Sequence, residues 1–351
     1  MIGTLRVWAG ALCAGVVMLV GCSDKAPEQV LYFYNWSEYM PQSVLDDFRK
    51  ETGIRVVYTT YDSNEAMYAR LRLLDSSNAY DLAVPSTYYV SKMRAEGLLQ
   101  PIDRSRLTHF EQLDPHLVDQ AYDPGSQYSV PYLWGTTGMA VNTAVIDAGS
   151  VDGWADLWRP ELKGRVLLTN DVREVFHLGL RVLGYSGNST DEAEIAAAYQ
   201  KLKTLLPSVR AFNSDAPRMP FLEGEADIGV IWNGELVMAQ EDMPALQYLY
   251  PKEGAVVWVD SFVIPKNARN ADAAHQFIDF ALRPEIAARI SEEIGYATPN
   301  LVARDLLPDA VRNNPASYPT DADLEQAEFQ TDVGEALLVY ERYWELLKAG
   351  K

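Results

Sequence analysis

Short runs of β-branched and other apolar residues alternate along this chain with amphipathic segments of helical length. The apolar runs lie at 30–34, 54–61, 80–85, 165–169, 226–232 and 256–264. Amphipathic segments lie between or after them at 42–52, 64–74, 171–183 and 271–282. Strands joined through helices pair mainly in parallel, because a parallel connection needs a long crossover. The alternation therefore predicts an α/β fold.

The length of the chain predicts more than one packed body. A chain of 351 residues can form one large or two ordinary domains, each with its own core. The apolar stretch 128–142 reads as one long strand interrupted by Gly135 and Gly138. We expect this strand to cross between two lobes.

The first residues predict export. Arg6 precedes an uncharged, mostly apolar stretch at 7–20, which is shorter than the about 20 residues that span a membrane. Residues 1–21 are therefore expected to be a secretory signal. The sequence Leu-Val-Gly-Cys that ends at Cys22 is a lipobox, so Cys22 should carry a lipid and 22–28 should form a tether. The expected location is the periplasm, as a membrane-anchored lipoprotein.

The formal charge of the chain is −19. A field of this sign repels nucleic acid and draws cations into a cleft. We therefore expect a cationic ligand rather than a nucleic acid.

Aromatic and acidic side chains follow the predicted strands. In open α/β sheets, ligands bind just beyond the carboxyl ends of the strands. Lysine and arginine are scarce at these positions, with Arg173 as the nearby exception. The residues found at or beside the strand ends are Trp36, Ser37, Tyr39, Ser86, Tyr88, Asp171, Glu174, Trp232, Trp258 and Asp260.

This combination suits an organic cation. Ring faces attract ammonium groups by about 0.5–2 kcal/mol each, and carboxylates accept charge-assisted hydrogen bonds from them. A polyamine alternates ammonium groups with methylenes that rings can cover. Packing explanations also exist, since Asp171 and Glu174 fit a helix capping box, and Trp36 and Trp232 fit a core.

Motifs of catalysis and cofactor binding are absent from the sequence. It contains no Gly-x-Ser-x-Gly, Gly-x-Gly-x-x-Gly, Walker A or His-Glu-x-x-His pattern. The histidines at 109, 116, 177 and 275 are scattered. We expect no catalytic residue, metal or cofactor, although a carbohydrate-active enzyme with paired acids and aromatics stays open.

Several segments resemble one family over nearly the whole chain beyond the leader. They include LYFYNWSEYMP, YDLAVPSTYYVSKMR, SVPYLWG, WADLWRPELKG, IWNGE, WVDS, IGYATPN and QTDVGEALLVYE. These segments are similar in order and spacing to the spermidine/putrescine-binding proteins of bacterial polyamine ABC importers. The resemblance implies a two-lobed periplasmic binding protein of type II, with mixed, mainly parallel sheets and hinge crossovers. One lobe would comprise 29–135 plus 259–304, and the other 136–258 plus 305–351.

The resemblance also implies roles for individual residues. The aromatic box would be Trp36, Tyr39, Tyr88, Trp232, Trp258 and Tyr296. Asp171 and Glu174 would hold one terminal amine, and Asp260 would neutralise another nitrogen. Polar contacts would come from Ser37, Ser86 and Gln330. Tyr296 and Gln330 rest on the resemblance alone, and Ser37 departs from the threonine that is common in the spermidine-preferring type.

The predicted function is capture of spermidine, with putrescine as the second candidate, by a monomer that delivers it to an ABC permease in the membrane. No covalent bond is made or broken in this function. Two alternatives stay open. The same lobes could present a polyamine to a membrane receptor, or the adjacent Tyr88 and Tyr89 could bind ferric iron.

Overall fold

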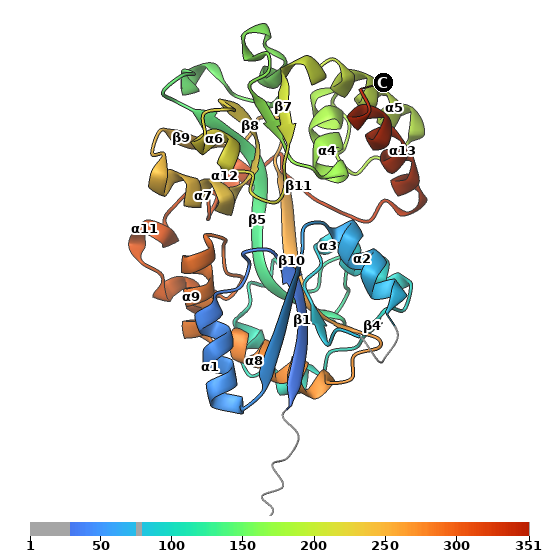
Figure 1. The fold of residues 1–351 in the computed structure, drawn as a ribbon, viewed down its shortest axis with the longest axis vertical. Coiled ribbons are helices and arrows are strands. Elements are labelled where there is room, and N and C mark those ends of the chain that lie inside the picture. Colours follow the sequence, from blue (N-terminus) through green and yellow to red (C-terminus); the bar gives the residue numbers. More distant parts are fainter. Residues whose placement is uncertain (1–28, 75–78, 351) are drawn as a thin grey trace, which may run out of the picture.

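Two lobes are stacked along the long axis of the molecule, and two long strands run through both (Figure 1). The structure is a computed structural model that describes residues 29–74 and 79–350. The long strands are β5 (Ser129–Asn142) and β10 (Val256–Pro265). The predicted signal segment 1–21, the predicted lipidation site Cys22 and the tether lie outside the described residues.

The lobe that contains the start of the described chain holds the first four strands and two groups of helices. Its strands are β1 (Val30–Trp36), β2 (Arg55–Tyr61), β3 (Leu82–Ala83) and β4 (Leu99–Gln100). Its helices are α1 (Gln42–Thr52), α2 (Asn64–Leu73), α3 (Thr87–Ala95), α8 (Ala271–Ala281), α9 (Pro284–Ile294) and α10 (Leu301–Leu306), with 3-10 turns at Arg104–Arg106 and Phe110–Gln112.

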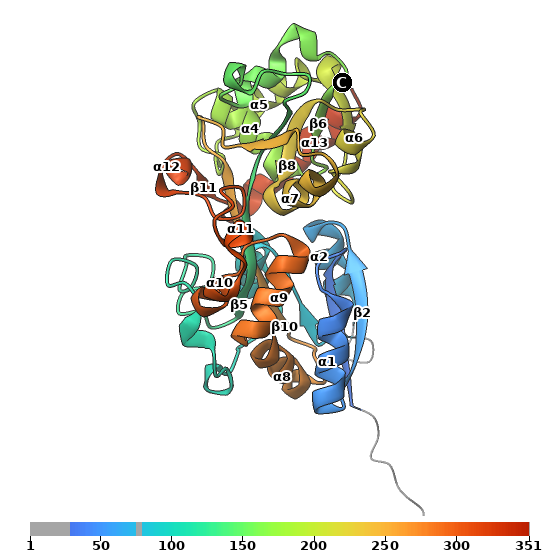
Figure 2. The same ribbon diagram turned by 90° about the vertical axis from the view of Figure 1, so that its left-hand side faces the viewer.

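The other lobe is built from the middle of the chain and its last helix. Its strands are β6 (Val166–Leu168), β7 (Val209–Phe212), β8 (Ile228–Trp232) and β9 (Leu246–Leu249). Its helices are α4 (Val172–Val182), α5 (Glu192–Lys203), α6 (Met219–Leu222), α7 (Asn233–Asp242) and α13 (Leu337–Lys348), with 3-10 turns at Ala148–Ser150, Trp154–Trp158, Pro160–Leu162, Leu206–Ser208 and Gly334–Ala336. The connecting region carries α11 (Asp309–Arg312), α12 (Asp321–Leu324) and β11 (Glu328–Phe329), which lie along one side of the molecule (Figure 2).

One mixed sheet connects the lobes, in the order β2-β1-β3-β10-β5-β8-β6-β7. The outer strands pair in parallel, as β1 does with β2 and β3, and β6 with β7 and β8. At the centre, β5 and β10 are antiparallel to each other. The predicted mixed α/β architecture is confirmed, and the antiparallel centre follows from two strands that cross the same waist in opposite directions.

Each lobe has its own hydrophobic core. One core gathers residues of β1, α1, α8 and α9, including Phe33, Phe48 and Phe277. The other gathers residues of β6, α4, α5, α13 and the 3-10 turn Trp154–Trp158, including Trp154 and Phe176. Separate cores let two bodies stay internally rigid while the strands between them bend.

Successive aromatic residues of β1 pack on opposite faces of the sheet, because side chains alternate along a strand. The Phe33 ring lies 5.1 Å from that of Phe277 on α8. The next ring, that of Tyr34, stacks on Tyr80 at 4.3 Å on the other face. Aromatic packing therefore covers opposite faces of the sheet at these two adjacent positions.

The ends of several elements differ from their predicted positions. The strand β1 continues to Trp36, two residues beyond the predicted end. The spacing of Asp62 and Glu65 predicts a capping box at the start of this helix, but Ser63 caps α2 instead by accepting a hydrogen bond from the amide of Ala66. The helix α7, which was not among the predicted helices, begins directly after the end of β8 at Trp232. Local patterns locate the ends of elements only to within one or two residues, because tertiary packing also decides where an element ends.

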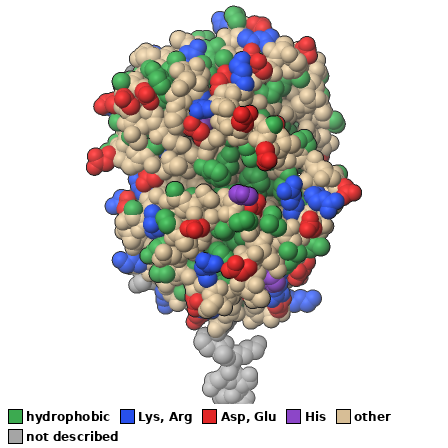
Figure 3. Space-filling view, turned by 180° about the vertical axis from the view of Figure 1, so that it is seen from behind, with side chains coloured by type: hydrophobic (Ala, Val, Ile, Leu, Met, Phe, Trp, Pro, Cys, Tyr) green, Lys and Arg blue, Asp and Glu red, His purple; other side chains and the backbone are tan. Residues whose placement is uncertain are grey.

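On the face opposite to that of Figure 1, acidic and basic side chains are interspersed and apolar side chains gather across the middle (Figure 3). The acidic surplus of the chain is thus spread over this face rather than concentrated in one patch.

Phe33 is expected to stabilise the first lobe strongly. Its side chain is fully buried, so Phe33→Ala should reduce the free energy of unfolding by about 3–5 kcal/mol through lost burial and the cavity left behind. The neighbouring Tyr32 is 41% exposed, and Tyr32→Ala should cost less than about 1 kcal/mol. Urea unfolding of both variants checks the difference, and equal losses would contradict this account of the core.

Candidate functional site

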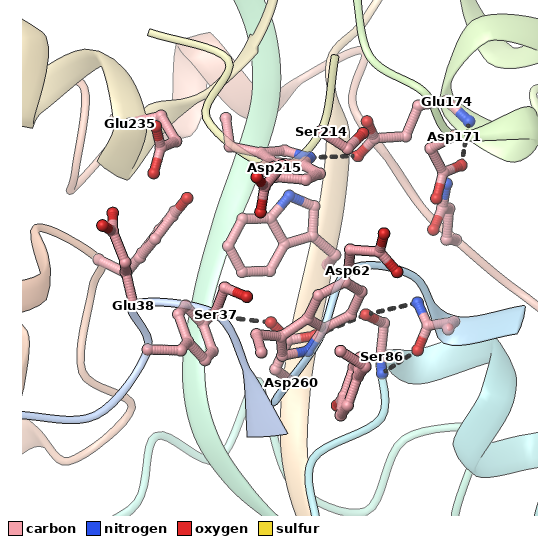
Figure 4. Close-up of a pocket in the computed structure, with 18 residues that line it drawn as sticks. Ser37, Glu38, Asp62, Ser86, Asp171, Glu174, Ser214, Asp215, Glu235 and Asp260 are labelled. Atoms are coloured by element: carbon pink, nitrogen blue, oxygen red, sulfur yellow. Dashed lines mark hydrogen bonds between the residues drawn. The ribbon is translucent and has the colours of Figure 1, made fainter. Parts of the chain in front are cut away.

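A cavity of about 710 Å³, including its opening to solvent, lies where the two lobes meet (Figure 4). Aromatic rings, carboxylates and hydroxyl groups make up most of its lining. The lining residues are Trp36, Ser37, Glu38, Tyr39, Tyr61, Asp62, Asn64, Ser86, Asp171, Glu174, Ser214, Asp215, Trp232, Glu235, Trp258, Asp260, Tyr296 and Gln330.

The ends of strands bring these residues together. In the first lobe, β1 and β2 end at Trp36 and Tyr61, and Ser86 directly precedes α3. In the second lobe, β8 ends at Trp232 and Asp171 caps the start of α4. The cavity thus lies beyond the carboxyl ends of parallel strands of both lobes, as expected for an open α/β sheet.

Asp260 lies on β10, lines the cavity and is buried. Its Oδ1 accepts a 2.6 Å hydrogen bond from the hydroxyl of Ser86, and its Oδ2 accepts a 2.8 Å bond from the hydroxyl of Tyr39. Burial raises the pKa of Asp260 to about 6, and the two hydroxyl donors partly offset this rise. Neutral donors orient the carboxylate but do not neutralise it, so this site favours an added cation.

A second pair of acids lies at the start of α4. Asp171 accepts a 3.0 Å hydrogen bond from the amide of Glu174, as a capping residue does. Burial raises the pKa of both carboxyls, and the charge of Asp171 raises that of Glu174 further. The capping interpretation is therefore correct for Asp171, but it leaves the buried Glu174 carboxyl facing the cavity.

Hydrogen bonds fix Glu174 together with two tryptophans. The Oε1 of Glu174 accepts from the Thr137 hydroxyl at 2.6 Å and from the indole of Trp232 at 2.8 Å. The same threonine oxygen accepts from the indole of Trp258 at 3.2 Å. Both indole rings are thus oriented before any ligand arrives, which lowers the ordering cost of binding.

Two ring contacts and two close approaches to glycine hold the aromatic wall. The ring of Tyr296 lies edge-on to Tyr39 at 5.3 Å and to Trp258 at 5.4 Å. A Cβ at Gly234 would lie 2.5 Å from the Tyr296 ring, and one at Gly135 would lie 2.8 Å from the Trp258 ring. These two positions need glycine so that the rings can lie flat against the backbone.

On the other side of the cavity, the indole of Trp36 donates to the carbonyl oxygen of Val84 at 2.9 Å. Its ring contacts Tyr61 at 4.7 Å. The end of β1 thus presents a ring that is anchored at its nitrogen, with its remaining surface available to line the cavity.

Two buried polar atoms of the lining lack a hydrogen-bond partner within the described part of the chain. They are Oε2 of Glu174 and Nε2 of Gln330. Buried polar atoms are nearly always paired in folded proteins, so an unpaired one calls for an explanation such as a bound water, ion or ligand. Both atoms belong to residues that line the cavity.

Eleven of the twelve residues nominated from the sequence line this cavity, and Tyr88 does not. Tyr88 is buried beside it, where its hydroxyl donates to Glu65 at 3.4 Å and its ring faces the guanidinium of Arg173 at 5.5 Å. Its ring therefore packs against that arginine, behind the lining.

The lining also contains residues that were not nominated: Glu38, Tyr61, Asp62, Asn64, Ser214, Asp215 and Glu235. Tyr61 and Asp62 lie at the end of β2, where the strand-end rule also applies. The capping-box spacing of Asp62 and Glu65 obscures this signal in the sequence. Glu235 lies in the first turn of α7, which was not expected to be a helix. Glu38 follows β1, at one of the predicted strand ends, but no residue near it in the sequence indicates a partner for its carboxylate.

The geometry does not favour an iron site at the adjacent tyrosines. Burial raises the pKa of Tyr88 and of Tyr89 well above the usual range, which disfavours the phenolates that ferric iron requires. Both hydroxyls donate to Glu65. Within residues 29–74 and 79–350, no group of three or more histidine, cysteine, aspartate or glutamate side chains is placed to hold a metal ion.

The chain is similar to known solute-binding proteins over nearly its whole length. The family profile described as bacterial extracellular solute-binding protein matches residues 43–320. The spermidine/putrescine-binding periplasmic proteins of Escherichia coli (strain K12) and Salmonella typhimurium are 50% and 49% identical, over 99% of this chain and 100% of each relative. A putrescine-binding periplasmic protein of Escherichia coli is 34% identical over 99% of both chains.

Solved structures show the same architecture. A putative spermidine/putrescine ABC transporter protein from Listeria monocytogenes superposes with a TM-score of 0.88 at 40% identity, over 92% of this chain and 100% of that one. A lipoprotein of Treponema pallidum gives a TM-score of 0.82 at 32% identity, over 91% and 99%. Among the helices that the structure describes, none is long and apolar enough to cross a membrane.

The family profile matches most of the chain, full-length relatives are about half identical to it, and solved structures share its fold. These findings agree with the cleft observed between the two lobes. The chain belongs to the bacterial extracellular solute-binding proteins, in the group of spermidine/putrescine-binding periplasmic proteins.

Proposed function

We propose that this protein captures a polyamine, spermidine or putrescine, in the cavity between its lobes and delivers it to an ABC permease as a monomer. The observation that carries the proposal is the presence of buried carboxyls, at Asp260 and Glu174, that are oriented by neutral donors within aromatic walls. The names of the full-length relatives support the ligand class.

The arrangement matches the alternating chemistry of a polyamine. Asp171 and Glu174 would hold a terminal ammonium group, and Asp260 would hold another nitrogen. The rings of the lining would cover the methylenes between them, with cation–π attraction at the ammonium groups. Ser37, Ser86 and Gln330 would add polar contacts, and Tyr88 would support the wall from behind.

The ligand would enter an open cleft and be enclosed as the lobes close. We place the crossover segments near residues 135–136 and 258–259, with lobes of 29–135 plus 259–304 and 136–258 plus 305–351. The two separate cores and the passage of β5 and β10 through both halves support this division.

The carboxylate of Asp260 should be essential for affinity. Asp260→Asn would leave an ammonium group unpaired in the closed cavity, and we expect spermidine binding to weaken by about 2–4 kcal/mol. The matched control is Asp62→Asn, because Asp62 lines the same cavity but is exposed, and its loss should change affinity by less than about threefold. Calorimetry on the two variants checks this, and unchanged affinity in a folded Asp260→Asn protein would contradict the assigned role.

Binding should release protons near neutral pH. Burial holds the pKa of Asp260 at about 6 and raises that of Glu174, whereas a bound ammonium group stabilises both carboxylates and lowers these values. Affinity should therefore rise several-fold from about pH 5.5 to about pH 7.5, the range over which the carboxyl of Asp260 in the free protein loses its proton. Calorimetry in buffers of different ionisation enthalpy measures the released protons, and Glu174→Gln should release fewer. Proton uptake on binding would contradict this account.

We also propose that Cys22 carries a lipid that anchors the exported chain to the membrane. The lipobox at 19–22 and the likeness to a lipoprotein of Treponema pallidum support it. Cys22→Ser should move the protein from the membrane fraction to the soluble fraction of the cell, as checked by fractionation and immunoblotting. Membrane association that persists in the variant would count against the anchor.

A further inference from the structure

Arg218 bridges the two lobes through Glu38 and Glu235, two residues that line one end of the cavity, although Arg218 itself is not part of the lining. Its Nη2 lies 2.9 Å from Oε2 of Glu38, which follows β1 in the first lobe. Its Nη1 lies 3.0 and 2.8 Å from the two carboxylate oxygens of Glu235, in the first turn of α7 in the second lobe. Arg218 itself directly precedes α6. One guanidinium thus joins carboxylates from opposite sides of the cleft.

Partial burial strengthens the electrostatic attraction between Arg218 and Glu235. The side chain of Glu235 is 9% exposed and that of Arg218 is 20% exposed, so their attraction is screened far less than at the open surface. Burial raises the pKa of Glu235, and the guanidinium opposes that rise and favours the ionised form. Glu38 is more exposed, at 65%, and forms the outer part of the bridge.

The backbone at Glu38 adopts a conformation that serves this contact. Its φ of 51° lies in the left-handed region, which is unfavourable for a residue with a side chain. Such a conformation persists where surrounding contacts compensate for it, and strained residues cluster at ligand sites. Here it accompanies an ion pair that crosses the cleft.

Glu38 and Glu235 both line the cavity, on the side opposite to Asp171 and Glu174 (Figure 4). Acidic groups therefore stand at both ends, but the two ends differ. The carboxyls at the start of α4 face the cavity with an unpartnered oxygen, whereas those at the other end are already bridged by a guanidinium.

We infer that Arg218 is a specificity-determining residue that pairs, as a built-in cation, with the two acids at one end of the cleft, and so limits the length and charge of the polyamine that the cleft accepts. This inference rests on the proposed polyamine-binding function. A short polyamine reaches Asp260 from the start of α4 and leaves the bridge intact. A longer one with a fourth ammonium group reaches two carboxylates that the guanidinium already pairs, and the nearby positive charge of Arg218 repels it.

The test is calorimetry with putrescine, spermidine and spermine on the full chain and on Arg218→Gln. Removal of the guanidinium leaves Glu38 and Glu235 free for a terminal ammonium group. We expect the affinity for spermine to rise by about tenfold or more relative to that for putrescine. In Arg218→Gln combined with Glu235→Gln, the gain for spermine should be largely lost because the buried acceptor is gone.

Two further variants control for charge and for folding. Arg210 forms an exposed ion pair with Glu225 in the same lobe, so Arg210→Gln makes the same charge change away from the cavity and should leave selectivity unchanged. Arg218→Lys keeps a cation at the site and should keep the discrimination against spermine, which tests the inference even if Arg218→Gln folds poorly.

The possible outcomes distinguish a failure of this inference from a failure of the proposed polyamine-binding function. If Arg218→Gln weakens all three polyamines equally, or leaves their relative affinities unchanged, the residue only joins the lobes and the inference is overturned. If the unaltered protein binds none of the three, the proposed function itself fails. A gain for spermine that also appears in Arg210→Gln would assign the effect to net charge and overturn the inference.

Discussion

Carboxyl groups buried at the junction of two lobes are the constraint on which the rest of this structure depends. A buried carboxylate without a cation is costly, and a protein meets this cost by raising the pKa or by supplying a partner. Asp260 and Glu174 show the first response, through burial that only hydroxyl and indole donors offset. The buried environment of these two carboxyls therefore favours the binding of a cation that enters from outside.

The framework around these acids fixes their orientation before binding. Thr137 on the crossing strand β5 holds Glu174 and the indole of Trp258 at once, so an acid from one lobe is tied to an aromatic ring on the other crossing strand. Close approach at Gly135 and Gly234 lets the rings of Trp258 and Tyr296 press against the backbone. Rigid walls of this kind reduce the ordering cost that a flexible, highly charged ligand would otherwise add to binding.

The two ends of the cleft use charge in opposite ways. At the start of α4, Oε2 of Glu174 has no hydrogen-bond partner within the described residues. At the far end, Arg218 already pairs with Glu38 and Glu235. Because Arg218 contacts carboxylates from both lobes, the same side chain contributes to closure and to the electrostatic boundary of the cavity. An ion pair that spans a cleft can therefore act on selectivity as well as on the balance between open and closed forms.

By itself the sequence determined the alternation of strands and helices, the two-lobed family and most of the cavity lining, because strand ends such as Trp36, Trp232 and Asp171 are local features that a pattern reveals. It could not determine that Tyr88 packs behind the lining, or that Arg218 pairs with Glu38 and Glu235, which lie 180 and 17 positions from it along the chain. Only the tertiary structure brings the lobes close enough to pair them. Coulomb attraction across the cleft depends on that closeness and on burial, and no local pattern encodes either.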